Sequence, residues 1–246
     1  MNGARAAELA ANLARVEERV TRACVTAGRA REEVTLVVVT KTYPAEDVRL
    51  LAGLGVRHVA ENRDQEAAAK AAACADLPLK WHFVGQLQTN KARSVVRYAD
   101  YVHSVDRVRL VSALSSAVVN AGRAPLKCFV QVALEKEEGA AGAEDGPGRG
   151  GAPPGGAAAV AAAVTEAPGL ELAGVMTVAP LSGPYAGAPA AAFARLVNLA
   201  RDLRRVDPAA TMVSAGMSGD LEEAIAAGAT HVRVGTAVLG VRPALR

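Results

Sequence analysis

The feature that most constrains the fold is a regular alternation of short β-branched or apolar runs with helical stretches, repeated eight times after residue 34. This alternation is typical of βα units, whose parallel strands are buried on both faces. The predicted strands are Thr35–Thr40, Arg57–Ala60, Lys80–Val84, Tyr101–Ser104, Leu126–Ala133, Glu171–Val178, Thr211–Ser214 and His231–Val234. The predicted helices that follow them are Pro44–Leu54, Asp64–Ala73, Thr89–Tyr98, Arg107–Ala121, Ala157–Thr165, Ala188–Arg205, Asp220–Ala227 and a short terminal stretch.

The length of this repeat favours a closed barrel over an open sheet. Residues 35–235 give about 25 residues for each of eight units, and a (β/α)8 TIM barrel has about 250 residues in all. An open doubly wound sheet also alternates, but no Gly-x-Gly-x-x-Gly follows the first predicted strand. We therefore predict a TIM barrel in the α/β class, formed as a single domain by residues 1–246.

Two segments lie outside the repeat. Residues 4–27 are predicted to form an amphipathic helix that covers one flank of the barrel, because apolar side chains recur at spacings of three and four. That stripe consists of Leu9, Leu13, Val16, Val20 and Cys24. Residues 139–156 contain eight glycines and three prolines, and we expect a flexible loop that is a tolerated insertion.

Composition excludes several classes of protein. A net charge of +3 spread along the chain gives no nucleic-acid-binding surface. Apolar stretches such as Leu36–Val39 are far shorter than the roughly 20 residues of a membrane span, and charged residues near the N-terminus argue against a secretory signal. Three widely separated cysteines indicate reduced thiols in a cytoplasmic protein, and the histidines lack the spacing of metal ligands. We expect a cytoplasmic monomer without metal, nucleic acid or membrane as partner.

The last two predicted strands end in segments typical of phosphate binding. Ser214-Ala-Gly-Met-Ser218 follows the seventh strand, and Gly235-Thr236 follows the eighth. The loops after strands seven and eight are the recurrent phosphate site of TIM barrels, where backbone N–H groups face the ligand. Arg233 lies two residues before Gly235 and is predicted to point inward with it. Each segment alone also fits an ordinary tight turn, but together they favour phosphate binding.

Lys41 ends the first predicted strand, where a lysine is usually a solvated charge or an ion-pair partner. At a barrel mouth, however, a lysine amine can form a Schiff base with a carbonyl ligand. A Schiff-base lysine and a phosphate site, placed on opposite sides of one mouth, describe a pyridoxal phosphate site. An enzyme of another phosphorylated metabolite would explain the phosphate site but would leave Lys41 without a role.

Several motifs resemble the family of pyridoxal phosphate homeostasis proteins, which look like the barrel domain of alanine racemase standing alone. The resemblance covers nearly the whole chain in the right order. The segments that carry it are Thr40-Lys-Thr42, Glu61-Asn62, Trp81-His-Phe-Val-Gly-Gln-Leu-Gln-Thr-Asn-Lys91, Ser214–Ser218 and Arg233–Gly240.

The resemblance implies that pyridoxal 5′-phosphate is held as an aldimine of Lys41. It further implies that Ser214, Ser218, Gly235 and Thr236 hold the phosphate, that Arg233 lies against the pyridine nitrogen, and that Asn62 and His82 line the ring pocket. The chain departs from the family pattern at Tyr43, at Arg63 and in the length of the Gly/Pro-rich loop. Strand alternation alone gives His82 another interpretation, that of a packed core histidine.

The resemblance also implies a role in vitamin B6 homeostasis, as a carrier or regulator of pyridoxal phosphate whose partners are apoenzymes that receive it. The alternative is an amino-acid racemase, which needs an acid/base group on each face of the substrate. In alanine racemases the second base is a tyrosine from an additional domain. Tyr43 and Tyr185 are the only loop tyrosines that could replace it, and neither has a sequence context that distinguishes it as a base. We therefore favour a protein without enzymatic activity and assign no catalytic residue.

Overall fold

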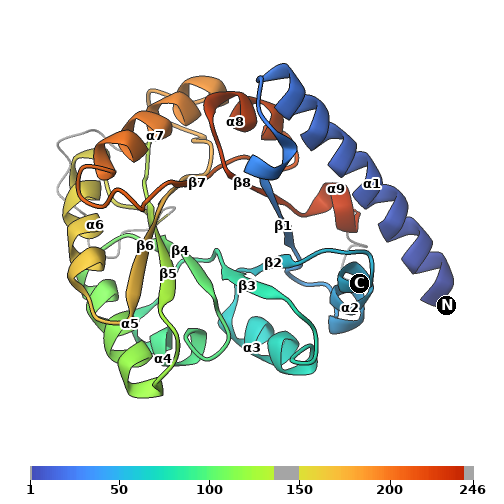
Figure 1. Ribbon diagram of the computed structural model, residues 1–246, viewed down its shortest axis with the longest axis horizontal. Helices are drawn as coiled ribbons and strands as arrows, with labels where there is room; N and C mark the ends of the chain where they lie inside the picture. The colour runs from blue at the N-terminus through green and yellow to red at the C-terminus, as the bar shows by residue number, and fades with distance from the viewer. Residues whose placement is uncertain (1, 136–149, 241–246) are drawn as a thin grey trace.

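A computed structural model describes residues 2–135 and 150–240, and its eight parallel strands close into a barrel in the order of the sequence. Figure 1 shows the strands around the centre and the helices outside them. The strands are β1 Thr35–Val39, β2 His58–Glu61, β3 Lys80–Phe83, β4 Tyr101–Val105, β5 Leu126–Gln131, β6 Leu170–Met176, β7 Met212–Ser214 and β8 His231–Val234. The predicted TIM barrel is therefore confirmed.

Helices follow the strands as the alternation predicts. They are α2 Ala45–Gly53, α3 Asp64–Ala73, α4 Ala92–Val95, α5 Val108–Ala121, α6 Ala157–Glu166, α7 Pro189–Leu203, α8 Leu221–Ala227 and α9 Thr236–Leu239. The helix predicted over residues 89–98 is too long at both ends, because Thr89–Lys91 forms a 3-10 turn before α4 and α4 already ends at Val95. Thr89 and Asn90 have polar side chains that compete with helical hydrogen bonds, which disfavours an α-helix there.

The N-terminal helix α1 spans Asn2–Thr26 and lies along the outside of the barrel beside α8 and α9 (Figure 1). Its predicted apolar stripe is buried, with Leu9, Val20 and Cys24 fully enclosed. The Asn12 side-chain amide donates a hydrogen bond of 2.9 Å to the carbonyl of Val238 in α9. This helix thus covers the flank where the first and last strands of the barrel meet.

Alternation along the strands separates an outer layer, packed on the helices, from the inside of the barrel. On β8, Val232 and Val234 belong to the apolar cluster that also contains residues of α1, whereas His231 and Arg233 point inward. On β3, Trp81 packs outward and His82 points inward, where it stacks on Tyr101. The inside of the barrel is therefore unusually polar for a packed core.

Close backbone contact in the barrel depends on Gly174. Its φ is +151°, and an added Cβ would lie 1.8 Å from the Met212 carbonyl oxygen on β7. Only glycine allows β6 and β7 to approach in this register.

The predicted loop over residues 139–156 extends too far at its C-terminal end. Residues 139–149 lie outside the part of the chain that the structure describes, but residues 150–156 are packed against the end of β5. Ala152 is 3% exposed, accepts a hydrogen bond from Ala133 N and donates one to Gln131 O, and a 3-10 turn follows at Pro154–Gly156. These backbone pairs extend the sheet, which composition alone does not reveal.

Candidate functional site

The barrel brings Lys41 next to the end of β8. β1 pairs directly with β8, with Val38 opposite Val234, and an added Cβ on Gly235 would lie 3.3 Å from the Val39 carbonyl oxygen. The expectation that Lys41 faces the predicted phosphate residues across the mouth is therefore wrong. Closure of the sheet makes the first and last strands neighbours, so the two groups end adjacent strands.

The chain is strained where it leaves β1. Lys41 is exposed, and the next residue, Thr42, has a φ of +67°, which β-branched residues rarely adopt. The carboxylate of Glu66 accepts a hydrogen bond of 3.1 Å from the Thr42 amide and so stabilises this conformation. Strained backbone of this kind persists where surrounding contacts impose it and is frequent at ligand sites.

A buried ion pair lies directly beneath Lys41. Lys70 of α3, 8% exposed, donates hydrogen bonds to the fully buried Glu61 carboxylate at 2.7 Å and to the Thr40 carbonyl oxygen at 2.8 Å. The Thr40 hydroxyl also donates to Glu61, at 2.6 Å. Burial raises the pKa of Glu61, and its bonds to Lys70 and Thr40 oppose that rise. This network fixes the peptide group between Thr40 and Lys41.

Sequence reasoning missed Lys70. Its signal is a lysine on the otherwise apolar face of a helix rich in alanine, between the buried Ala67 and Ala71. Such a lysine needs a buried partner, and Glu61 at the end of β2 supplies it.

Asn62 follows Glu61 at the same end of the barrel and is half-buried. Its side-chain Oδ1 is enclosed and has no hydrogen-bond donor among the residues that the structure describes. The residue lines a cavity of about 350 Å³ with Phe83, Gln86 and Lys91. An enclosed acceptor without a donor costs free energy, which a polar ligand can recover.

Arg233 is 4% exposed and lies inside the barrel. Its guanidinium donates to the Ser214 hydroxyl at 2.5 Å and to the Thr177 carbonyl oxygen at 2.7 Å. Burial lowers the pKa of Arg233 to about 10, with Asp220 opposing the shift, so the side chain is charged at neutral pH. The structure therefore joins two of the predicted residues, Arg233 and Ser214, and adds Thr177.

The other predicted phosphate residues gather at the rim. Ser218 is half-buried, and its hydroxyl oxygen lies 3.4 Å from the backbone nitrogen of Ala237 in α9. Gly235 and Thr236 lie at the start of α9, and Thr236 is exposed. Ser214, in contrast, is fully enclosed and lies below this group, beside Arg233.

His82 is also enclosed, and it belongs to a chain of histidines inside the barrel. His82 Nε2 lies 2.9 Å from His58 Nδ1, and His82 Nδ1 lies 2.8 Å from His103 Nε2. His103 Nδ1 in turn lies 2.9 Å from the Ser214 hydroxyl. Burial and the nearby positive charges lower the pKa of His82 and His103 well below the ordinary value, so both rings are neutral. The sequence shows each histidine at a strand position but not this contact between strands.

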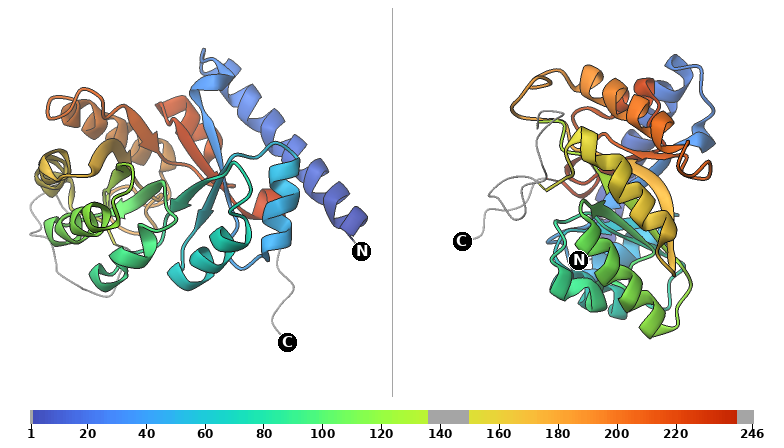
Figure 2. Two further views of the ribbon diagram at one scale, coloured as in Figure 1. Left: turned by 60° about the horizontal axis from the view of Figure 1, so that its bottom comes forward. Right: turned by 90° about the vertical axis from the view of Figure 1, so that its left-hand side faces the viewer.

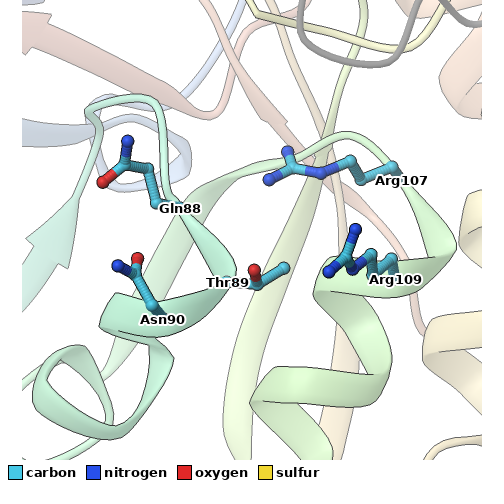
Figure 3. Close-up of a pocket in the computed structure, with 5 residues that line it drawn as sticks. All are labelled: Gln88, Thr89, Asn90, Arg107 and Arg109. Atoms are coloured by element: carbon cyan, nitrogen blue, oxygen red, sulfur yellow. The ribbon is translucent and has the colours of Figure 1, made fainter.

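A second cavity lies on the rim after β3 and β4. It has a volume of about 390 Å³ and is lined by Gln88, Thr89, Asn90, Arg107 and Arg109. Figure 3 shows both guanidinium groups pointing toward the segment that carries Thr89. This cavity adjoins strands away from β7, β8 and β1, so it is separate from the Lys41 group.

Two general features of the described residues bear on function. No group of three or more His, Cys, Asp or Glu side chains in this part of the chain is arranged to hold a metal ion. None of the described helices has the length and apolar character needed to cross a membrane. Figure 2 shows the barrel from two further sides.

Comparison with known proteins identifies the family. The sequence profile of "Alanine racemase, N-terminal domain" matches residues 7–243. The pyridoxal phosphate homeostasis protein of Mycobacterium tuberculosis is 42% identical over 253 residues, which cover 97% of this chain and 94% of that protein. The protein of the same name from Escherichia coli is 34% identical and covers 96% of this chain and 97% of its own length.

Solved structures agree with this assignment. PipY of Synechococcus elongatus, solved with pyridoxal phosphate bound, is 34% identical with a TM-score of 0.75 and covers 94% of this chain and all of that one. The crystal structure of an unknown protein from Bifidobacterium adolescentis gives a TM-score of 0.82 at 30% identity, and the match covers 96% of both chains. Alanine racemase from Corynebacterium glutamicum shares the fold at 16% identity, with a TM-score of 0.61 and 63% of its length covered. The chain therefore belongs to the family of pyridoxal phosphate homeostasis proteins.

Proposed function

We propose that this protein binds pyridoxal 5′-phosphate covalently through Lys41 and acts in its homeostasis as a carrier or regulator. The observation that carries the proposal is the placement of Lys41 on a strained turn beside Gly235, with the buried cation Arg233 on the same neighbouring strand. When bound, pyridoxal phosphate supplies an aldehyde that a lysine amine can attack reversibly. The names of the relatives and the ligand of PipY support the same group.

The residues present fit this cofactor. Lys41 is exposed and free to react, and Ser218, Gly235 and Thr236 form a polar turn on the neighbouring strand ends that suits a phosphate. Asn62 offers an enclosed acceptor, Oδ1, which has no donor among the described residues. Arg233, a buried cation inside the barrel, is the residue that would hold the pyridine nitrogen. A cation beside that nitrogen would disfavour its protonation and so weaken the ring as an electron sink.

Two residues act indirectly in this proposal. Ser214 and His82 are fully enclosed, so we assign Ser214 to holding Arg233 and His82 to the layer beneath the site. This replaces the direct contacts that the sequence resemblance implies for them. Apoenzymes as recipients, a monomeric state and a cytoplasmic location remain part of the proposal.

The direct test is the absorption spectrum of the purified protein with pyridoxal phosphate, before and after borohydride reduction. We expect a band of the bound cofactor and, after reduction, one pyridoxyl group that peptide mapping places on Lys41. A label on another lysine would contradict the assignment.

Replacing Thr236 by alanine should weaken cofactor binding without unfolding the barrel, because Thr236 is exposed and its side chain is not part of the core. Loss of a hydrogen bond to a charged phosphate costs roughly 1.5–3 kcal/mol, which is about 10- to 150-fold in dissociation constant. Fluorescence titration of the cofactor measures this change. Thr211→Ala, at an exposed site just before β7, serves as the matched control and should bind normally. Equal affinities in both variants would remove Thr236 from the site.

The cofactor-loaded protein should leave L-alanine and other common amino acids unracemised. Racemisation needs a second base, and Tyr43 is held away from that role because its hydroxyl donates a 2.8 Å hydrogen bond to the Gly240 carbonyl oxygen. Tyr185 packs partly against the outer apolar core. Chiral chromatography after long incubation provides the measurement. Turnover that disappears in Lys41→Ala would instead establish the racemase alternative, and Tyr43→Phe would then be the next variant.

A further inference from the structure

We propose that Ser214, His103, His82 and His58 form a proton relay through the barrel, in which the direction of the hydrogen bond between residue 214 and His103 sets the tautomer of all three histidines. The relay goes beyond cofactor binding: it connects the surroundings of Arg233 with the opposite end of the barrel. In this arrangement His103 and His82 are positioning residues, because they act on Arg233 through Ser214.

The links of the relay are short and shielded. The three contacts measure 2.9, 2.8 and 2.9 Å from Ser214 to His58, and Ser214, His82 and His103 have no exposed surface. Aromatic rings hold the histidines in place: His82 stacks on Tyr101 with centroids 4.2 Å apart, and His103 stacks on Phe129 at the same distance. Water therefore cannot replace any one link without a rearrangement of the core.

The direction of the relay follows from counting donors and acceptors. An arginine only donates, so the Ser214 oxygen accepts from Arg233. Among the described residues, the acceptor recorded for the enclosed Ser214 hydroxyl proton is His103 Nδ1. His103 then carries its proton on Nε2 and donates to His82 Nδ1, and His82 donates from Nε2 to His58 Nδ1. All three neutral rings are thus in the Nε2–H form, and any other form leaves a buried donor or acceptor unpaired.

The opposite form arises when Ser214 is replaced by a pure acceptor. His103 must then donate from Nδ1, which requires Nδ1–H on His82 and on His58 as well. To reach this form, protons move from His103 Nε2 to His82 Nδ1 and from His82 Nε2 to His58 Nδ1. Relative to the wild type, His103 Nδ1 gains one proton and His58 Nε2 loses one, so each ring stays neutral. In the variant this pattern is set as the chain folds, while both atoms are still open to solvent.

The far end of the relay can exchange this proton. His58 is half-buried and lines a cavity of about 310 Å³ at the N-terminal end of the barrel, together with Glu17, Arg31 and Arg57. Burial lowers the pKa of His58, with the charges of Asp100 and Lys80 acting in opposite directions. The tautomer of His58 at this cavity therefore depends on the direction of the hydrogen bond that His103 makes beside Arg233.

The sequence contains four histidines, and all of them lie inside the barrel, which makes ring-nitrogen NMR of the ¹⁵N-histidine-labelled protein a complete test. In the wild type without cofactor we expect His58, His82 and His103 to be protonated on Nε2. In Ser214→Asp, whose carboxylate can pair with Arg233 and accept from His103, we expect all three to be protonated on Nδ1. His231 bonds Thr230 instead, at 2.9 Å, and should not change, so it is the internal control.

Interrupting the relay distinguishes it from a general structural change. In the double variant Ser214→Asp, His82→Phe, the phenyl ring keeps the stack on Tyr101 but carries no proton, so His103 should change its tautomer and His58 should not. Wild-type rings with Nδ1–H, or a Ser214→Asp protein whose His58 stays in the Nε2–H form, would overturn the relay. If the Ser214→Asp protein fails to fold, two measurements still test the relay. One is the tautomers of the wild type. The other is the single variant His82→Phe, in which His58 loses its donor and its Nδ1 signal should shift. None of these measurements involves pyridoxal phosphate, so failure to bind it would overturn the proposed function alone.

Discussion

Lys41→Ala is expected to abolish covalent retention of pyridoxal phosphate while leaving the barrel folded. Lys41 is an exposed residue on the turn after β1, so removing its side chain exposes no core. The loss is complete because no non-covalent contact can replace a bond to the amine. Gel filtration of the loaded protein, followed by absorption of the retained fraction, measures the effect.

Lys80→Ala is the matched control, since Lys80 is an exposed lysine at the start of β3, away from the cavity beside Asn62. This variant should retain the cofactor as the wild type does. Non-covalent binding of the cofactor through its phosphate should persist in Lys41→Ala, because Thr236 and Ser218 are unchanged. Full covalent labelling of Lys41→Ala by borohydride would show that another lysine carries the cofactor.

Of the variants proposed, Lys70→Met is expected to lower the free energy of unfolding most, by about 3–5 kcal/mol. The reason is that it leaves the fully enclosed Glu61 without its cation. Urea denaturation followed by circular dichroism measures the free energy of unfolding. The double variant Glu61→Gln, Lys70→Met removes the buried charge as well and should recover much of the loss. A loss below 1 kcal/mol in the single variant would show that Glu61 is solvated or protonated without cost.

The Lys70→Met variant should also become less stable as pH rises. Burial raises the pKa of Glu61 even beside Lys70, and without the lysine this shift increases. The folded state then binds the Glu61 proton more tightly than the unfolded state, so the free energy of unfolding falls as pH rises from the ordinary glutamate value through the raised one. Below the ordinary value the penalty is absent. The double variant has no carboxyl at this position and should lack this part of the pH dependence.

The Lys70 network also bears on cofactor binding, because Lys70 holds the Thr40 carbonyl oxygen next to Lys41. A residue that fixes the peptide before the reactive lysine reduces the conformations that the turn can adopt. Positioning of this kind depends on a helix and two strands meeting, and it has no local motif.

Much of this protein is determined by local sequence. The period of apolar residues placed α1 and the eight strands, since a strand buried on both faces and an amphipathic helix each require one pattern of side chains. The position of Lys41, Gly235 and Thr236 at strand ends followed from the same pattern, because functional residues of a barrel collect there. Errors in the bounds of the elements were local: Thr89–Lys91 forms a 3-10 turn, and residues 150–156 pack on β5.

Contacts between strands were decided only by the tertiary structure. Closure of the barrel made β1 and β8 neighbours, and it enclosed Ser214 and His82, which sequence resemblance had suggested as direct ligands. It also joined His58, His82 and His103, which are 24 and 21 residues apart along the chain. Strand alternation tells which side chains point inward, but the register between strands sets which of them touch. Register depends on the packing of the whole closed sheet, and that is why a buried relay and a buried ion pair leave little trace in the sequence.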